Sequence, residues 1–242
     1  MSRDAKIQNQ LEQLYPFLHG KRQDPASQGR ALVESVRQKA RHHLDVIERF
    51  FAENSEGVVD TARTIAGIYR SGGRLFTMGN GGSSCDAAHV AVEFQHPVTA
   101  GRPALTAIDL TADRTMMTAV ANDVGFAHVY LRQLIALARP GDGLIGLSTS
   151  GNSDNLVRAF AKARTLGLKT IGLCGMDGGE MARLDLDHCL VVGTDSIHRI
   201  QECHVAIYHI LWDLVHTLLA DDRGALALDT EERTGEAADE VR

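Results

Sequence analysis

The sequence predicts an α/β fold: a three-layer sandwich with a central parallel sheet of about five strands flanked by helices, and further helices at the N-terminus. Short apolar segments alternate with helical patterns from residue 74 to residue 219, which is typical of a parallel sheet covered on both faces. The 242 residues are 44% hydrophobic, which is enough for one α/β core. Helical periodicity also begins well before the first apolar segment.

Two helices are expected ahead of the sheet. Residues 27–52 carry an apolar helical face, made by Leu32, Val36, Leu44, Ile47 and Phe51. A second helix is expected at 56–69, where the Ser-Gly-Gly segment at 71–73 ends it. We therefore assign residues 1–55 to an N-terminal helical extension.

The predicted sheet begins at residue 74. The apolar segments that indicate strands are 74–79, 104–109, 143–147, 169–175 and 188–193. Helices are expected directly after the first strand's loop and at 114–120, 128–137, 154–166 and about 200–219. Residues 56–220 are therefore assigned to one α/β domain. Residues 221–242 are acidic and lack an apolar stripe, so a disordered tail is expected there.

Composition and charge limit the classes of function. The net charge of −6 gives no electrostatic basis for direct binding of nucleic acid. No run approaches the ~18 apolar residues of a membrane span, and the polar N-terminus lacks the apolar core of a signal peptide. The four cysteines are scattered, as expected of reduced thiols. We therefore expect a cytoplasmic protein without a membrane partner.

A glycine-rich turn, Gly-Asn-Gly-Gly-Ser-Ser at 79–84, follows the first strand. Its glycines let backbone N–H groups approach a ligand at the carboxyl end of a strand, where open α/β sheets bind ligands. The dinucleotide pattern fails because Ser84 holds its last glycine position, which argues against a nicotinamide-dependent oxidoreductase. A P-loop fails because no lysine follows. A purely structural turn remains the alternative.

A second polar loop, Ser-Thr-Ser-Gly-Asn-Ser at 148–153, also follows a strand and precedes a helix. A phosphate placed there would meet hydroxyl donors and the positive end of a helix dipole. Ser153 is also expected to cap the helix, but a cap uses one hydroxyl and this loop has four. The loop therefore predicts a phosphate-binding site.

His89 and Glu93 form a third candidate, because residues four apart share one face of a helix. A histidine and a carboxylate can hold a divalent metal or act as acid and base. Isolated pairs of this kind are more often simple surface contacts. The last helix is rich in further polar candidates, namely His198, Gln201, His204, His209 and His216. Most of these histidines fit the core or the surface equally well.

The order of these motifs resembles the sugar isomerase (SIS) domain family, and within it the bacterial sedoheptulose 7-phosphate isomerases, or phosphoheptose isomerases. The similarity covers about residues 56–219 and includes Ala-Asn-Asp-Val-Gly-Phe at 121–126, Gly-Met-Asp-Gly-Gly-Glu-Met-Ala at 175–182 and Arg-Ile-Gln-Glu-Cys-His at 199–204. The resemblance implies the SIS fold, aldose–ketose isomerase activity and one divalent metal, zinc, per active site. It also implies a homotetramer with its sites near subunit contacts.

Carried over residue by residue, the resemblance gives each motif a role. It implies that the metal ligands are His89, Glu93, Gln201 and His209. Glu93 would also be the catalytic base and His209 the acid. The implied contacts of the phosphorylated sugar are Asn80, Gly81, Gly82, Ser83, Glu93, Asn122, Asp123, Ser148, Thr149, Ser150, Ser153 and Gln201. The implied reaction converts sedoheptulose 7-phosphate to a heptose 7-phosphate aldose through a metal-assisted enediol(ate).

Spacing constrains this implied site. Gln201 and His209 are eight residues apart, which is about 12 Å along an ideal helix and near the limit for one ion. Either the helix bends near Gln201, or the ligands come from different subunits. The two roles of Glu93 also oppose each other, because metal ligation lowers the basicity that a general base needs.

Two positions depart from the family pattern. The arginine expected four residues after Glu93 is Pro97, and the aspartate expected three residues before Gln201 is His198. These changes indicate a different sugar phosphate, or a different way of holding the same one. The alternative function is a non-catalytic sugar-phosphate-binding or scaffold SIS protein, similar to the relative that binds the replication initiator. That relative lacks the glutamate and final histidine that this chain has as Glu93 and His209.

Overall fold

The computed structural model describes residues 25–99 and 101–220. The apolar patch at 11–18 and the expected tail at 221–242 lie outside the described residues. The chain divides into two compact units, with the boundary between His42 and His43. The described part of the first unit is the beginning of helix α2 (Pro25–Arg70), where Glu34 accepts a hydrogen bond of 2.7 Å from Arg41.

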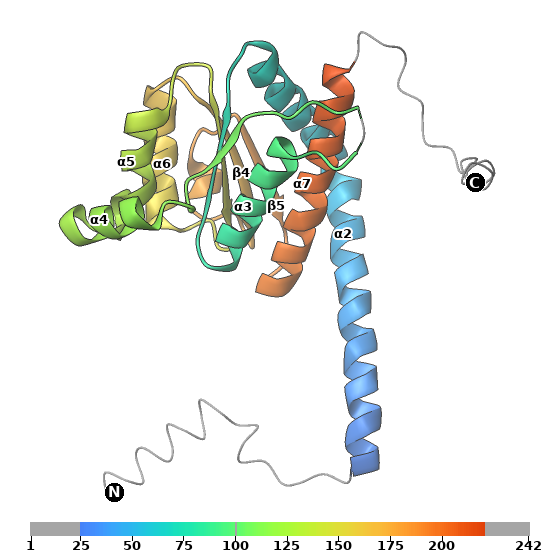
Figure 1. Ribbon diagram of the computed structural model, residues 1–242. Helices are drawn as coiled ribbons and strands as arrows, with labels where there is room; N and C mark the ends of the chain where they lie inside the picture. The colour runs from blue at the N-terminus through green and yellow to red at the C-terminus, as the bar shows by residue number, and fades with distance from the viewer. Residues whose placement is uncertain (1–24, 100, 221–242) are drawn as a thin grey trace, which may run out of the picture. The chain divides into compact units, whose positions relative to one another are not determined.

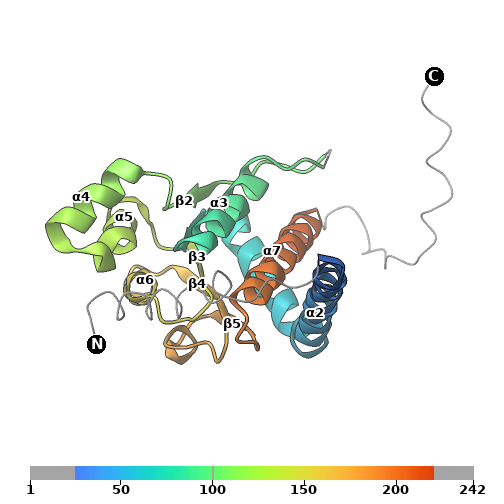
Figure 2. The same ribbon diagram turned by 90° about the horizontal axis from the view of Figure 1, so that it is seen from below.

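The described residues of the second unit form a five-stranded parallel sheet in the order β2-β1-β3-β4-β5 (Figures 1 and 2). The strands are β1 (Leu75–Gly79), β2 (Ala107–Asp109), β3 (Gly143–Ser148), β4 (Lys169–Gly175) and β5 (His188–Val192). The further helices are α3 (Gly82–Gln95), α4 (Arg114–Val124), η2 (Phe126–His128), α5 (Val129–Leu137), α6 (Asp154–Thr165), η3 (Met181–Arg183) and α7 (Ile197–Leu219). The predicted fold class is confirmed.

Alternating strand residues supply two apolar cores, one on each face of the sheet. On β1, Leu75 packs with α2, α3 and α7, whereas Phe76 and Met78 pack with α4, α5 and α6. On β3, Ile145 joins the first core and Leu144 the second. Because both faces are apolar, these strands appear in the sequence as continuous apolar runs.

The N-terminal helices differ from the prediction. Two helices were expected at 27–52 and 56–69, but α2 is one helix of 46 residues. No glycine or proline interrupts the expected gap, where Asn54 and Ser55 bond to the carbonyls of Phe50 and Phe51. The domain boundary after residue 55 stays a prediction, and α2 runs across it. Neither α2 nor any other described helix has an apolar stretch long enough to cross a membrane.

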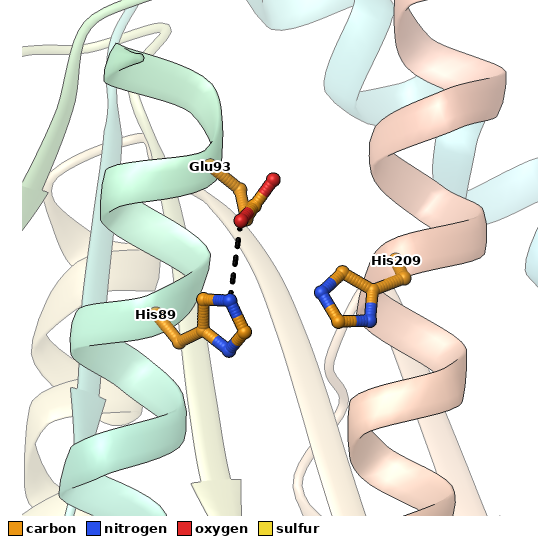
Figure 3. A group of neighbouring side chains, drawn as sticks. All are labelled: His89, Glu93 and His209. Carbon is orange, nitrogen blue, oxygen red and sulfur yellow. Dashed lines mark hydrogen bonds and ion pairs between the residues drawn. The ribbon is translucent and has the colours of Figure 1, made fainter. Parts of the chain in front are cut away.

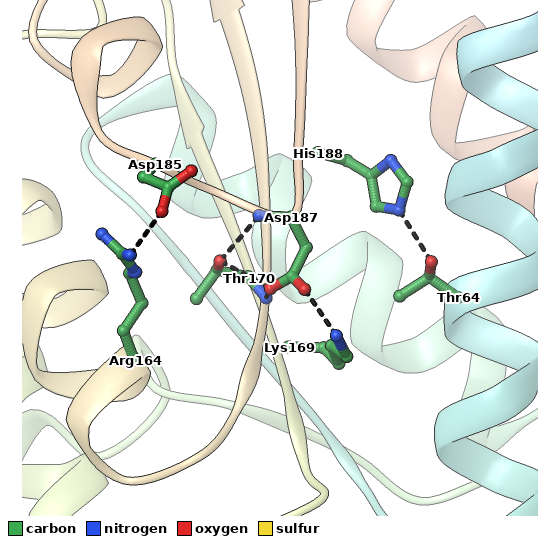
Figure 4. Close-up of polar contacts among 7 residues, drawn as sticks. All are labelled: Thr64, Arg164, Lys169, Thr170, Asp185, Asp187 and His188. Atoms are coloured by element: carbon green, nitrogen blue, oxygen red, sulfur yellow. Dashed lines mark hydrogen bonds and ion pairs between the residues drawn. The ribbon is translucent and has the colours of Figure 1, made fainter.

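Polar contacts close the amino ends of β4 and β5 (Figure 4). Asp187 accepts hydrogen bonds from the side chain of Lys169 at 2.6 Å and the backbone of Thr170 at 2.9 Å. Burial opposes ionisation of Asp187, but these donors outweigh it and lower the pKa of the carboxyl group. Nearby, His188 lies 2.7 Å from the hydroxyl of Thr64. The predicted binding loops lie at the opposite, carboxyl edge of the sheet.

Gly146 on β3 tests how tightly the sheet packs against α6. A Cβ atom there would lie 2.6 Å from Cζ of Phe160 and 2.9 Å from Cε of Met78. Gly146→Ala is therefore expected to lower the free energy of unfolding by about 1–3 kcal/mol in urea titrations. Gly67→Ala is the control, because its Cβ would meet nothing within 4 Å. Gly67→Ala, in α2, should raise the free energy of unfolding by about 0.5–1 kcal/mol. Equal effects of Gly146→Ala and Gly67→Ala would contradict the close packing of β3 against α6.

Candidate active site

The two polar loops meet where the connections diverge across the sheet. β2 lies on one side of β1, whereas β3 and β4 lie on the other. The helices that follow β1 and β3, α3 and α6, cover opposite faces. The loops that join β1 to α3 and β3 to α6 therefore lie side by side and lead to opposite faces of the sheet. This is a topological switch point, the position where open α/β sheets bind ligands. Two reciprocal amide hydrogen bonds of 2.9 Å between Asn80 and Asn155 link the segments.

The glycine-rich turn has little space for side chains. A Cβ atom on Gly79 would lie 2.1 Å from the carbonyl oxygen of Ser83, and Gly81 has a φ of 56°, which favours glycine. Ser83 is buried. The side-chain amide of Asn80, an implied substrate contact, is bonded to Asn155. The exposed parts of this turn are therefore the backbone at Gly81 and Gly82.

The serine loop is organised by its own hydroxyls. The oxygens of Ser148 and Ser153 lie 3.0 Å apart, and Ser148 also accepts from the backbone N–H of Gly151 at 3.1 Å. The expected side-chain cap of α6 by Ser153 was wrong, because its hydroxyl makes no capping bond to the helix. Ser150 accepts from the backbone of Asn152. The N–H groups of Leu156 and Val157, in the first turn of α6, instead bond to the backbone carbonyl of Ser153 at 2.9 and 3.0 Å.

A neighbouring turn holds this loop in place. Asn152 accepts a 2.9 Å hydrogen bond from the backbone of Glu180, and Met181 donates to the carbonyl of Gly151 at 2.9 Å. A Cβ atom on Gly151 would lie 2.0 Å from the carbonyl oxygen of Gly178. The sequence showed the segment 175–182 only as a landmark. The pair of glycines within it was the signal for this close backbone contact.

Three side chains implied as metal ligands come together in one chain (Figure 3). Nε2 of His89 lies 3.1 Å from Oε1 of Glu93 on α3, and the ring of His209 on α7 lies 5.0 Å from that of His89. One ligand atom from each residue lies within 4.8 Å of the other two. The structure therefore favours a common site over an isolated surface pair.

The helices α3 and α7 run side by side in the same direction. Three contacts advance together along both helices: Gly82 with Gln201, His89 with Tyr208, and Glu93 with Trp212. Gln201 therefore lies at the beginning of α3, where a Cβ atom on Gly82 would be 2.3 Å from its Nε2. Since α7 is helical throughout Ile197–Leu219, Gln201 precedes His209 by about two turns.

Burial sets the protonation of groups around this cluster. Burial and the nearby His89 lower the pKa of His209, although Glu93 opposes this shift. The neutral imidazole keeps one lone pair for a cation and one N–H donor. Burial also raises the pKa of Asp86 to about 6, against the effect of His89. Sequence reasoning missed Asp86 and Tyr208, whose signal was their spacing from His89 and His209.

The remaining implied substrate residues lie elsewhere in the chain. Asn122 and Asp123 are exposed on α4 and bond to each other at 2.8 Å. Figures 1 and 2 show α4 beyond α5, on the side of the sheet away from α7. A single chain therefore does not bring these two residues to the histidine cluster, and their role stays a prediction.

Two histidines of α7 belong to the core. His204 is fully buried, and its Nε2 donates a hydrogen bond of 3.0 Å to the carbonyl of Cys174 on β4. His216 is also buried and packs between Phe94 and Trp212. By contrast, His198 is exposed at the start of α7. His204 thus anchors to the sheet the helix that carries Gln201 and His209.

The fold and the polar edge of the sheet define a SIS domain protein, and the SIS domain family model matches residues 40–175. The chain is 42% identical over 196 residues to a phosphoheptose isomerase from Desulfovibrio desulfuricans, covering 81% of this chain and 92% of that protein. A phosphoheptose isomerase structure from Neisseria gonorrhoeae is 34% identical, covers 77% of this chain and 99% of its own, and superposes with a TM-score of 0.73. The chain therefore belongs to the phosphoheptose isomerase family of aldose–ketose isomerases, as its motifs predicted.

His204 predicts a defined pH dependence. Burial lowers its pKa from 6.5 to about 4, so the unfolded chain binds a proton at pH 5 that the folded protein does not. The free energy of unfolding of the metal-free protein should fall by about 2 kcal/mol through this group between pH 7 and pH 5. His204→Gln keeps an N–H donor but does not titrate. Urea unfolding of both proteins at both pH values should show a smaller fall for the variant, and equal falls would contradict the assignment.

Proposed function

We propose that this protein is a metal-assisted sugar-phosphate isomerase that interconverts sedoheptulose 7-phosphate and a heptose 7-phosphate aldose. The observation that carries the proposal is the convergence of His89, Glu93 and His209, with ligand atoms within 4.8 Å of one another. Membership of the phosphoheptose isomerase family supports the reaction class. A non-catalytic scaffold has no need for a histidine–carboxylate cluster of this kind, which favours the enzyme over that alternative.

The chemistry of these side chains fits a divalent cation, most simply zinc. Two imidazoles and a carboxylate are the nitrogen and oxygen ligands that zinc accepts, and tetrahedral ligand atoms lie ~3.3 Å apart. The ligand atoms of His89, Glu93 and His209 now lie within 4.8 Å of one another, so modest side-chain rotations would bring them to that spacing. Gln201 is proposed as the fourth ligand; because it lies about two turns before His209 on α7, this requires a bend of that helix or a ligand from a neighbouring subunit. When bound, the ion supplies a Lewis acid for negative charge on the sugar oxygens.

The phosphate end of the sugar is assigned to the serine loop. Ser148, Thr149, Ser150 and Ser153 offer hydroxyls beside the start of α6, where backbone N–H groups and the helix dipole favour an anion. The glycine-rich turn, with Asn80, Gly81, Gly82 and Ser83, would contact the sugar itself. Because α4 is apart from the cluster, we propose that Asn122 and Asp123 reach a site from a neighbouring subunit of a homotetramer.

Isomerisation moves a proton between C1 and C2 of the sugar. Glu93 is proposed as the base that carries this proton, since its side chain is only 20% exposed and lies beside His89. His209 is proposed as the acid that donates a hydrogen bond from its imidazole N–H to the sugar oxygen, while Glu93 returns to one carbon the proton it takes from the other. The lowered pKa of His209 means that it acts through a neutral ring N–H. Hydrogen bonding to the developing oxyanion lowers the barrier.

Glu93→Gln tests the assignment of the base. The amide keeps the shape of the side chain but cannot accept the carbon proton, so kcat with sedoheptulose 7-phosphate should fall by about 10²–10⁴-fold. Thermal unfolding of the metal-free variant should match that of the native protein. Glu48→Gln on the exposed face of α2 is the matched control and should retain full activity. An active Glu93→Gln enzyme would end this assignment.

Gly82→Ala tests the place of Gln201. The new Cβ would lie 2.3 Å from Nε2 of Gln201 and push its amide aside. Zinc binding, measured by competition with a chromogenic chelator, should weaken by about tenfold. In a Gln201→Ala background the same change should have little further effect, because the group it displaces is gone. Additive losses would show that Gly82 acts without Gln201.

A further inference from the structure

Both ring nitrogens of His89 have protein partners. Nε2 lies 3.1 Å from the carboxylate of Glu93, and Nδ1 lies 2.7 Å from the hydroxyl of Tyr208 on α7. An ionised carboxylate only accepts hydrogen bonds, so the neutral ring carries its proton on Nε2. Tyr208 then donates its O–H to Nδ1. This is the tautomer expected of His89 without a cation.

A cation at the cluster requires the other tautomer. A histidine binds a metal through the lone pair of a ring nitrogen. In His89 the ring nitrogen that faces Glu93 is Nε2. The ring proton must then reside on Nδ1, which leaves the ring neutral with the same number of protons. Nδ1–H now donates to the oxygen of Tyr208. The hydroxyl proton of Tyr208 therefore needs a new acceptor.

Asp86 provides such an acceptor. It lies one turn before His89 on α3, and its Oδ2 is buried without a hydrogen-bond partner among the described residues. After burial, the charge of Asp86 is the largest influence that raises the pKa of Tyr208, and His89 in turn influences the pKa of Asp86. Asp86 and His89 are three residues apart on α3 and so share the helix face on which His89 contacts Tyr208, and the pKa effects agree with this placement. A buried carboxylate oxygen without a donor is costly unless a partner is supplied in another state.

We propose that Tyr208 and Asp86 act together as positioning residues that hold the metal-binding tautomer of His89. Nδ1–H of His89 donates to Tyr208, and Tyr208 donates to Asp86. The arrangement fixes the ring orientation and satisfies the buried oxygen only when Nε2 is occupied by a cation. Neither residue touches the substrate or the ion. This inference rests on the metal site of the proposed function.

Zinc affinity of the full-length protein, measured by chelator competition, tests the proposal. Tyr208→Phe and Asp86→Ala should each weaken zinc binding by about 10–100-fold. Asp86→Asn, which keeps an acceptor oxygen, should lose less than Asp86→Ala. The double variant Tyr208→Phe/Asp86→Ala should bind no more weakly than the weaker single variant, because both changes break one chain of hydrogen bonds. Thermal unfolding of the metal-free variants shows whether each one folds.

Tyr69→Phe is the matched control, since that hydroxyl donates to the backbone carbonyl of Thr106 away from the cluster. Its zinc affinity should equal that of the native protein. If the native protein binds zinc and the Tyr208 and Asp86 variants bind it equally well, the inference is overturned while the proposed function stands. Additive losses in the double variant would also overturn it. If the native protein binds no zinc and His89→Ala leaves the chelator competition unchanged, the metal site of the proposed function is wrong.

Discussion

The parallel packing of α3 and α7 is the constraint on which the candidate site depends. α7 packs closely on the sheet at Gly175 of β4, where a Cβ atom would lie 2.3 Å from Ile200. The two helices approach each other as closely at Gly82, where a Cβ atom would lie 2.3 Å from Nε2 of Gln201. Buried residues on both helices, among them Ala87, Ala91 and Cys203, join one core. The packing places each polar residue of α3 opposite a defined residue of α7, so the site is a property of the helix pair rather than of a loop.

The sequence predicted the sheet well, because strands buried on both faces leave long apolar runs between glycine-rich loops. The sequence-based prediction failed where a side chain could make either of two hydrogen bonds. Ser153 looked like a helix cap, yet its hydroxyl pairs with Ser148. Periodicity also placed a break in α2 where local hydrogen bonds allow the helix to continue.

The histidines of α7 show why the site could be only partly predicted. From spacing alone, His204, His209 and His216 are equally good candidates for the site. His204 and His216 are buried and pack in the core. Only His209 faces α3 at the level of His89. That distinction depends on the register of two helices far apart in the sequence, which no local pattern encodes. Tyr208 was missed for the same reason, since its contact with His89 exists only across this helix pair. Asp86 is different, because it lies on α3 three residues before His89, a local spacing that the sequence analysis did not use.

The departures at Pro97 and His198 bear on how the sugar is held. The nearest arginine after Pro97, Arg102, stacks on Trp212 at 4.4 Å and pairs with Asp213 at 2.5 Å. Because this guanidinium is bound to α7 by two contacts, it supports the helix that carries His209 and is a poor substitute for a free cation at the substrate. In the proposed function, the anionic end of the sugar is therefore assigned to neutral donors, the hydroxyls and backbone amides of the serine loop. A site of this kind would bind through geometry more than through net charge, so we expect the fixed backbone of that loop to be its main determinant of affinity.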